Sequence, residues 1–176
     1  PMALEPQQPW ECGGIFTGSA TVLEPGGIVL AFAVECNEAI GVALPSNASD
    51  PLLTDWRTPT RVVSHTPSYN FRDPVTAFRP PPTAASNGTE AEWRMAVGCS
   101  GHLCTFRSAD FQTWRDAGSF YHVPGQHMWE CPDVFPLPGS DGLWVIKVSS
   151  APFDEYVVGR LHTGANDSFV PVEGAA

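Results

Sequence analysis

The sequence predicts an all-β fold built from repeated β-propeller blades. Three pairs of marker residues are separated by nearly the same number of residues: Thr17 to Asp73 is 56, Asp73 to Glu130 is 57, and Trp56 to Trp114 is 58. Short apolar runs alternate with Pro- and Gly-containing turns, and no amphipathic helical stretch of 10 or more residues occurs. Propeller blades are four-stranded sheets that repeat about every 40 to 50 residues, so this period with loop insertions favours a propeller. A β-sandwich is the alternative, but it gives no reason for three markers to repeat in step.

The first repeat is expected over residues 14–70. Its strand candidates are short, apolar or β-branched runs between turn residues, at positions 14–23, 28–34 and 39–44. The run at 28–34 is continuously apolar, which is typical of a buried strand. Ser49, Asp50 and Trp56 then close the unit in a Pro-rich turn.

The same order recurs in two further repeats, expected over residues 71–127 and 128–176. In the second repeat a short first strand at 71–78 precedes a Pro-rich insertion at 80–92. Ser108, Asp110 and Trp114 close this repeat as their counterparts close the first. The other strand candidates are residues 93–98 and 102–107, then 134–137, 143–148 and 155–161.

The charge balance excludes one class of partner. The chain has 19 acidic residues against 9 Lys and Arg, a formal net charge of -10. A nucleic-acid partner requires clustered cations to neutralise phosphates, so none is predicted. The longest apolar run, at residues 28–34, is far shorter than the roughly 20 residues of a membrane span, so no membrane partner is predicted either. Neutral, hydroxyl-rich ligands remain compatible with this composition.

The cysteines and histidines predict no metal centre. No cysteine pair has the C-x-x-C spacing of zinc or thioredoxin-type motifs, and the histidines share no ligand spacing. The odd number of cysteines leaves at least one thiol without a partner inside the chain. The cysteines are Cys12, Cys36, Cys99, Cys104 and Cys131, and the histidines are His65, His102, His122, His127 and His162. His127 is close to Glu130 in sequence, but it is expected to be an ordinary loop histidine.

Three glycosylation sequons, at Asn47, Asn87 and Asn166, favour the secretory route. The chain begins at Pro1 without an initiating Met or a charged-then-apolar leader, so we expect an internal piece of a longer protein. The expected location is secreted, in the cell wall or in the vacuole.

The repeat period predicts a shared polar pocket. Phe16-Thr17, Arg72-Asp73 and Glu130 occupy corresponding points at the start of successive first strands. The first strand of a blade lines the central channel of a propeller, so these side chains are expected to converge on one axial pocket. The alternatives are local: a glutamate on a surface turn, and an Arg-Asp ion pair that caps a turn before Pro.

Two carboxylates that face one pocket predict glycoside hydrolysis. Met128 and Trp129 beside Glu130 would desolvate its carboxyl and favour the protonated form that a general acid needs. Arg72 would instead keep Asp73 ionised. From the residues alone, Asp73 and Glu130 form the catalytic pair, and Trp129 is the tryptophan expected near the pocket.

Three segments resemble signature motifs of glycoside hydrolase family 32, the family of invertases, fructan hydrolases and related fructosyltransferases. They are Trp129-Glu130-Cys131-Pro132-Asp133, Phe71-Arg72-Asp73-Pro74 and Ile15-Phe16-Thr17-Gly18-Ser19-Ala20-Thr21. Residues 41–53 and 106–114 also resemble the plant-like members, so the resemblance covers essentially the whole chain.

The resemblance implies a five-bladed propeller followed by a β-sandwich, and a retaining double displacement on β-fructofuranosides such as sucrose or fructans. Glu130 would be the general acid/base, with Cys131 helping to place it. Asp73 would hold sugar hydroxyls and stabilise the transition state, with Arg72 beside it. Phe16 and Thr17 would contact the substrate; the family often has Ser where this chain has Thr17. No metal or cofactor is implied.

The chain departs from the family in one respect. The nucleophile is an Asp in an Asn-Asp-Pro-Asn-Gly motif, and that motif does not occur in these residues. The period places it about one blade before Phe16, upstream of Pro1. Sequence like the last blade and the sandwich is also missing after Ala176. We therefore expect an incomplete catalytic propeller of roughly three blades, without the C-terminal β-sandwich, that needs the rest of its chain and is inactive alone. A fructosyltransferase, a non-catalytic sugar-binding protein and a glycosidase from another five-bladed family are the alternatives.

Overall fold

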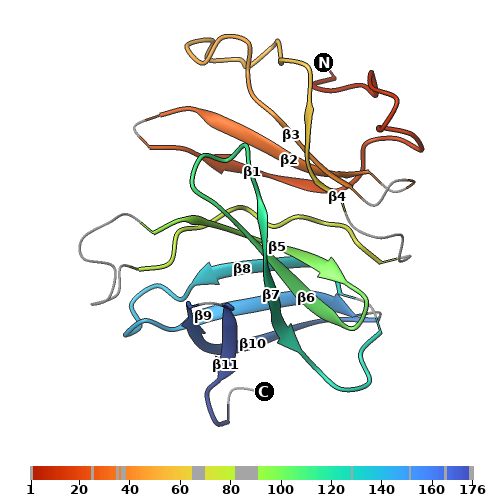
Figure 1. The fold of residues 1–176 in the computed structure, drawn as a ribbon. Helices are drawn as coiled ribbons and strands as arrows, with labels where there is room; N and C mark the ends of the chain where they lie inside the picture. Colours follow the sequence, from red (N-terminus) through yellow and green to blue (C-terminus); the bar gives the residue numbers. More distant parts are fainter. Residues whose placement is uncertain are drawn as a thin grey trace.

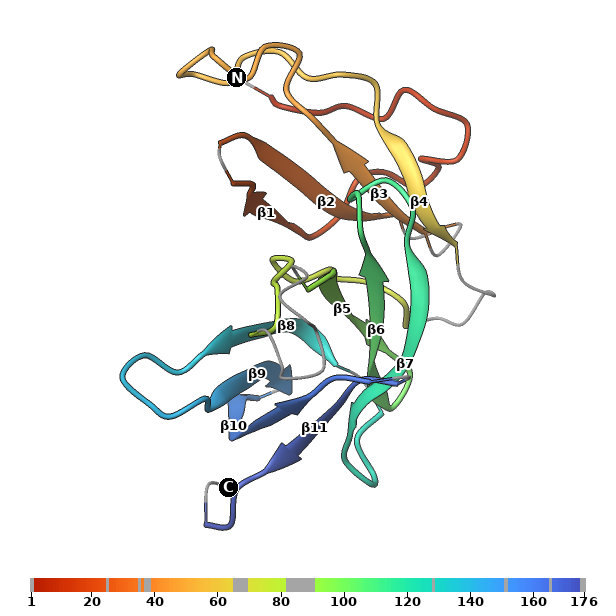
Figure 2. The same cartoon turned by 60° about the vertical axis from the view of Figure 1, so that its left-hand side comes forward.

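The computed structural model describes residues 2–174 except positions 25, 35, 37–38, 65–69, 82–90, 128, 151 and 165. Eleven β-strands and no α-helix occur in the described part of the chain, which confirms the predicted all-β class. The strands form three antiparallel sheets that follow one another from the N-terminal to the C-terminal end of the molecule (Figures 1 and 2). Nothing helical among these residues is long and apolar enough to cross a membrane.

The first sheet has the order β1-β2-β3-β4. Its strands are β1 (Gly18–Val22), β2 (Ile28–Val34), β3 (Ala39–Ala43) and β4 (Thr60–Ser64). The predicted run at 28–34 coincides with β2, which is mostly buried. The sequence did not predict β4, because this edge strand buries only Val63 and carries no apolar run.

The second sheet has three strands, β5 (Trp93–Cys99), β6 (His102–Ser108) and β7 (Arg115–His122). The first strand predicted at 71–78 is wrong as a regular strand. This segment runs beside β5 through isolated bridges at Arg72 and Phe78 and a 3.0 Å hydrogen bond from the Val75 N–H to the Ala96 carbonyl, without a continuous ladder. The physical reason lies between them: Asp73 has a φ of 60°, and Pro74 has no N–H to donate. β7 was also missed, because its Asp, Gly and alternating exposed residues give a weak strand signal.

The third sheet has the order β11-β10-β9-β8. Its strands are β8 (Glu130–Pro136), β9 (Trp144–Ser150), β10 (Phe153–His162) and β11 (Ser168–Pro171). The last strand, with four residues, was not predicted. The sheets thus span residues 18–64, 93–122 and 130–171. The repeat limits 14–70, 71–127 and 128–176 stay a prediction, as does the absence of a β-sandwich.

Two apolar layers join neighbouring sheets. The layer between the first and second sheets includes Ile40, Met95 and Phe106, and the layer between the second and third includes Phe120, Trp129 and Ile146. Full burial of a large apolar side chain contributes about 1.5 to 3 kcal/mol. These layers therefore fix the spacing of the sheets and of the segments at their inner edges.

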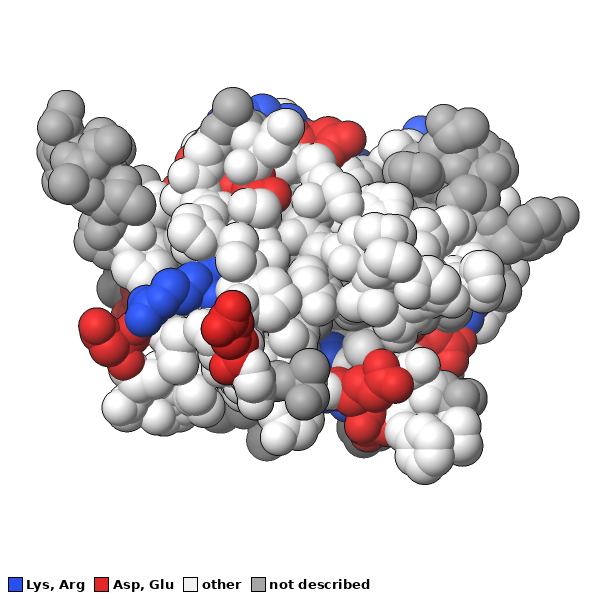
Figure 3. Space-filling model, turned by 90° about the horizontal axis from the view of Figure 1, so that it is seen from below, with Lys and Arg blue, Asp and Glu red and all other residues white. Residues whose placement is uncertain are grey.

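Exposed apolar side chains remain on the outer face of the third sheet. Tyr156 of β10 and Val170 of β11 point to this face, and Phe153, at the start of β10, is exposed as well. Figure 3, which looks at the molecule from this end, shows a mostly uncharged surface with separated charged groups. Monomeric proteins rarely expose large contiguous apolar patches, and such patches mark interaction surfaces or aggregation liabilities.

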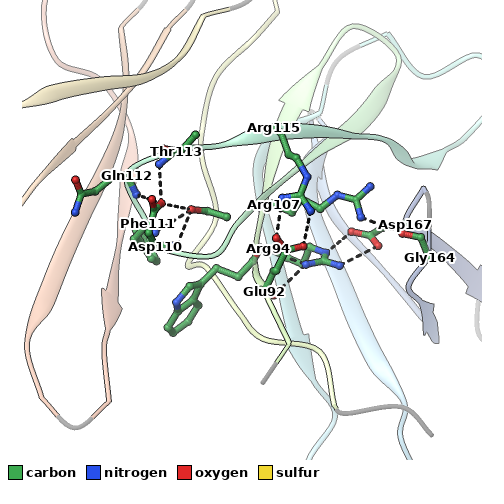
Figure 4. Close-up of polar contacts among 12 residues, drawn as sticks. Glu92, Arg94, Arg107, Asp110, Phe111, Gln112, Thr113, Arg115, Gly164 and Asp167 are labelled. Atoms are coloured by element: carbon green, nitrogen blue, oxygen red, sulfur yellow. Dashed lines mark hydrogen bonds and ion pairs between the residues drawn. The ribbon is translucent and has the colours of Figure 1, made fainter. Parts of the chain in front are cut away.

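An Asp-centred turn closes each of the first two repeats. Asp50 accepts hydrogen bonds from the N–H groups of Leu52 (2.9 Å) and Thr54 (3.0 Å). Asp110 accepts from Gln112 and Thr113 at 2.8 Å each, as Figure 4 shows. These backbone donors lower the pKa of both carboxyls. The repeated Ser, Asp and Trp markers therefore end in structurally similar turns.

Charged side chains form ion pairs and hydrogen bonds between the second and third sheets (Figure 4). Arg94 of β5 forms a buried ion pair with Asp167, which lies just before β11. Asp167 also donates its N–H to the carbonyl of Ala117 on β7, at 3.1 Å. Arg107 of β6 donates to the carbonyl of Gly164 at 3.0 Å. The β10–β11 hairpin is thereby fixed to the neighbouring sheet.

Two disulfides and one thiol account for the five cysteines. Cys12 pairs with Cys36, and Cys99 pairs with Cys104. Cys131 is free and exposed. The unpaired thiol expected from the odd cysteine number is therefore Cys131.

Candidate functional site

The segments at the inner edges of the three sheets meet at one cavity. Phe16 and Thr17 precede β1, Arg72 and Asp73 lie beside β5, and Glu130 begins β8. These five residues line a cavity of about 220 Å³, together with Ala33 and Cys131. Residues more than a hundred positions apart are therefore brought together as the repeat period predicts.

The sixth predicted site residue does not reach this cavity. Trp129 is 1% exposed and packs edge-on against Tyr121, with ring centroids 5.5 Å apart, in the layer between the second and third sheets. Its role beside the substrate stays a prediction that the geometry does not favour. Met128, the other apolar neighbour invoked for Glu130, lies outside the described residues, as do His65 and Asn87.

Glu130 is not desolvated as its sequence neighbours suggest. Its side chain is 46% exposed, because Trp129 turns into the interior and does not cover it. Glu130 Oε1 accepts a hydrogen bond from the Arg72 guanidinium. The expected pairing of Arg72 is thus only partly correct, because its Nε is 3.9 Å from Asp73 Oδ2 and its closer partner is Glu130.

Asp73 is the buried carboxylate of the site, with an exposed fraction of 5%. Its Oδ2 accepts a 2.8 Å hydrogen bond from the backbone N–H of Cys131. Asp73 and Cys131 both have positive φ angles, 60° and 42°, which are uncommon outside Gly. The backbone is therefore held in two unusual conformations where the two segments meet.

The Cys131 thiol sits beside both carboxyl groups. Partial burial of the thiol has the largest effect in raising its pKa, and the negative charges of Asp73 and Glu130 raise it further. A neutral thiol is a poor nucleophile and metal ligand. Cys131 contributes to the site through its N–H, which places Asp73, and not through thiolate chemistry.

Gly98 of β5 allows the close approach of the two site segments. Its N–H donates to the Arg72 carbonyl at 2.9 Å, and the Arg72 N–H donates to the Gly98 carbonyl at 3.0 Å. A Cβ at this position would overlap the carbonyl oxygen of Trp129 and lie 3.2 Å from that of Arg72. Sequence reasoning missed this residue, although an isolated Gly inside a strand pattern is a known sign of close backbone approach.

A second cavity of about 440 Å³ continues along the same inner edges. It shares Thr17, Asp73 and Cys131 with the first cavity and adds Asp133 and Lys147. Lys147, the only lysine of the chain, is held by Ser149 (2.9 Å) and Asp154 (3.2 Å). Neither was predicted as a site residue: Asp133 ends the Trp129-Asp133 motif but was given no role, and Lys147 lies on the regular strand β9 without a motif of its own.

The site can bind a neutral polyol and transfer a proton. Its described lining contains hydroxyl, carboxylate and guanidinium groups, which recognise sugar hydroxyls, and the exposed Phe16 ring can pack on a sugar face. No group of ligands close enough for a metal ion occurs at this cavity among the described residues; the one such group is Cys99, His102 and Cys104.

Comparisons with known proteins agree with this picture. The family model "Glycosyl hydrolases family 32 N-terminal domain" matches residues 1–173. A fructan 6-exohydrolase from Beta vulgaris is 32% identical over 99% of this chain and 32% of its own length. A cell wall isozyme of beta-fructofuranosidase from Zea mays is 35% identical over 89% of this chain and 28% of its own.

A solved structure extends the likeness to three dimensions. The crystal structure of fructan 1-exohydrolase IIa from Cichorium intybus matches with a TM-score of 0.74 and 25% identity. The match covers 97% of this chain and 35% of that one. The chain thus spans about a third of the length of the relatives that it matches.

Proposed function

The chain belongs to glycoside hydrolase family 32, and we propose on that basis that the whole protein cleaves β-fructofuranosides such as sucrose or fructans with retention of configuration. Members of this family fold as five-bladed β-propellers, of which this chain supplies about three blades. The observation that carries the proposal is the convergence of Arg72, Asp73 and Glu130 on the cavity that Phe16 and Thr17 also line.

Glu130 is the general acid/base of the proposed reaction. Its Oε1 is bound by Arg72, so Oε2 is the oxygen available for proton transfer. In the first step it protonates the glycosidic oxygen as the bond to the fructosyl carbon breaks. In the second it takes a proton from the water that releases fructose. Its 46% exposure gives that water access to the carboxyl.

Asp73 is the transition-state stabiliser. The N–H of Cys131 fixes its orientation before substrate arrives, so no reorganisation is needed when charge develops on the sugar. A buried carboxylate accepts strong hydrogen bonds from adjacent hydroxyls. Phe16, Thr17 and Arg72 complete the contacts to the fructosyl unit.

The nucleophile of the retaining mechanism is not among residues 1–176, which contain no Asn-Asp-Pro-Asn-Gly motif. Without it no glycosyl-enzyme intermediate can form. We therefore propose that residues 1–176 alone do not hydrolyse sucrose, and that the rest of the chain completes the propeller and covers the apolar face of the third sheet. Turnover by the isolated 176 residues that depends on Glu130 would contradict this.

Two alternatives use the same pocket. A fructosyltransferase would pass the fructosyl group to a sugar instead of water, and product analysis at high sucrose concentration distinguishes it from a hydrolase. A non-catalytic sugar-binding protein would lack the nucleophile in its complete sequence. The full-length sequence decides this second question.

The location proposed is the secretory route, ending in the cell wall or vacuole. Relatives include one named vacuolar and one named a cell wall isozyme. Two disulfides suit an oxidising compartment. The sequon residues Asn47 and Asn166 are exposed.

The direct test is Glu130→Gln in the intact protein, assayed on sucrose and on 1-kestose. Loss of general acid/base catalysis lowers kcat by about 10²- to 10⁴-fold. For a substrate whose leaving group needs no protonation, the rate of the glycosylation step falls much less in Glu130→Gln. Glu155→Gln, an exposed glutamate of β10, is the matched control and leaves kcat unchanged. Equal rates for the Glu130→Gln variant and the native protein would refute the assignment.

A further inference from the structure

A group of metal-ligating side chains lies at the β5–β6 turn and has no part in the proposed reaction. Cys99 ends β5, His102 begins β6, and Cys104 follows two residues later. Cys99 pairs with His102 in register and Cys104 pairs with Val97, so the three side chains share one face of the sheet. Their ligating atoms lie within 4.8 Å of one another, and the two cysteines are joined as a disulfide.

The His102 ring already has the orientation of a metal ligand. Its Nδ1 is 2.9 Å from the carbonyl oxygen of Ser100. A carbonyl oxygen only accepts, so Nδ1 carries the proton and Nε2 of the neutral ring presents a lone pair. Nε2 lies 3.2 Å from Cys104 Sγ. Histidines that bind metals almost always donate the other ring N–H in this way, often to a backbone carbonyl.

The spacing suits a tetrahedral ion. Zinc bonds of about 2.3 Å to sulfur and about 2.0 to 2.1 Å to nitrogen place the two ligand atoms about 3.6 Å apart. The observed 3.2 Å between His102 Nε2 and Cys104 Sγ requires a shift of only a few tenths of an ångström. His122 of β7 lies directly opposite His102 and is exposed. Its Nδ1 is 2.7 Å from the Gly101 carbonyl oxygen, so its Nε2 also presents a lone pair.

We propose that reduction of the Cys99–Cys104 disulfide creates a binding site for zinc or another thiolate-preferring divalent ion, formed by Cys99, His102 and Cys104. His122, which is not part of the 4.8 Å group, turns its exposed ring into the fourth position. A dithiol reductant supplies two electrons and two protons to the S–S bond and becomes a disulfide itself. The ion then displaces the two thiol protons, which pass to solvent, and binds the two thiolates and the neutral imidazoles. Disulfide and metal site therefore exclude each other.

The Cys99–Cys104 disulfide is expected to be reduced more readily than Cys12–Cys36, because it closes a shorter loop. Cys99 and Cys104 are 5 residues apart, whereas Cys12 and Cys36 are 24 apart. A cross-link that closes a shorter loop removes less entropy from the unfolded chain and stabilises the oxidised fold less. Two thiolates with imidazole are the ligand set that selects zinc over calcium or magnesium.

The test titrates cobalt(II), as a spectroscopic substitute for zinc, into the intact protein with Cys131→Ser, which removes the free thiol. After reduction with dithiothreitol and its anaerobic removal, we expect tetrahedral ligand-field bands and a thiolate-to-cobalt charge-transfer band at one equivalent, both lost on adding zinc. The oxidised protein shows neither band. Loss of a group that only supports a metal ligand costs about 10- to 100-fold in metal affinity. Loss of the ligand His102 itself should cost at least as much, so His102→Gln raises the cobalt Kd at least about tenfold.

Three controls make the assignment specific. Cys104→Ser weakens the charge-transfer band and raises the cobalt Kd, because only the Cys99 thiolate remains, and an unchanged unfolding temperature of the reduced protein shows that this variant remains folded. The double variant Cys12→Ser, Cys36→Ser keeps the bands, and His162→Gln, an exposed histidine of β10, keeps the native Kd. Absence of bands in the reduced protein, or bands that follow Cys12 and Cys36 instead of Cys104, would overturn the proposal.

Discussion

The backbone N–H of Cys131 donates a 2.8 Å hydrogen bond to Oδ2 of Asp73, and both residues have positive φ angles. Sparsely populated backbone conformations of this kind cost about 1 to 3 kcal/mol each and cluster at functional sites. Here they join two sheets: Asp73 lies beside β5, and Cys131 lies in β8. The contact fixes the buried carboxylate in the cavity before any ligand binds.

Asp73→Asn is expected to lower kcat/KM of the intact protein on sucrose by about 10- to 150-fold. The amide keeps an acceptor for the Cys131 N–H, but the charge is lost, and hydrogen bonds to charged groups contribute about 1.5 to 3 kcal/mol. If Asp73 acts in the transition state, the loss falls on kcat more than on KM. Asp141→Asn, in the exposed β8–β9 turn, is the control. A change confined to KM would show ground-state binding instead.

Arg72→Lys tests the guanidinium that holds Glu130. Lysine keeps the positive charge but cannot reach Glu130 and Asp73 with a planar fork. We expect kcat/KM to fall about 10-fold or more, since a charge-assisted hydrogen bond contributes about 1.5 to 3 kcal/mol. Arg61→Lys, on the exposed edge strand β4, leaves the rate unchanged. Native kinetics for Arg72→Lys would mean that Glu130 does not depend on this contact.

Gly98→Ala tests the close approach of the two site segments. The added methyl group overlaps the Trp129 carbonyl oxygen, a backbone atom that cannot rotate away. Overpacking of this kind costs about 1 to 3 kcal/mol, and thermal unfolding measures it. Gly164→Ala is the control, because its nearest neighbour would be 3.7 Å away. Equal unfolding temperatures for the two variants would show that the backbone at Gly98 has more room than the structure indicates.

The sequence predicts the interior of this fold better than its edges. The strand at 28–34 was predicted because a buried strand requires a continuous apolar run in the sequence. β4 and β11 bury one side chain each and therefore show no such pattern. The segment at 71–78 has strand-like composition, but the positive φ of Asp73 depends on its contact with Cys131, 58 residues away. Local propensity cannot contain that information.

The sequence predicted five of the residues that line the cavity, but not Ala33, Cys131 or the contacts among them, and it wrongly placed Trp129 beside them. Repeat symmetry placed Phe16, Arg72 and Glu130 at one cavity, because equivalent points of successive blades face the same axis. It could not say that Trp129 turns inward or that Arg72 reaches Glu130, since both depend on side-chain packing between sheets. Gly98 is different, because an isolated Gly within a strand pattern does signal close backbone approach, but the sequence does not say which segment approaches it.

Asp167→Leu is expected to destabilise the intact protein by about 3 to 5 kcal/mol, because it leaves the buried Arg94 guanidinium without the carboxylate that balances its charge. The double variant Arg94→Met, Asp167→Leu recovers most of this loss, since apolar side chains can replace a buried pair. Glu92→Gln removes one partner of the more exposed Arg115 pair and costs no more than about 1 kcal/mol. Chemical denaturation measures all three. A double variant as unstable as the single one would show that the pair itself stabilises the sheet junction.

The Asp110 turn is expected to make the protein less stable as pH falls. Hydrogen bonds from the N–H groups of Thr113 and Gln112 lower the pKa of this carboxyl in the folded protein. A lowered folded-state pKa means that the stabilisation is complete above the unfolded value of about 3.9 and is lost as pH falls through the folded value. Asp110→Asn keeps an acceptor but cannot titrate, so its unfolding temperature falls less steeply below about pH 4 than that of the native protein. Thermal unfolding between neutral pH and pH 3 measures the two slopes, with Asp141→Asn as control. Parallel curves for the native protein and Asp110→Asn would show that the turn does not contribute to the acid sensitivity.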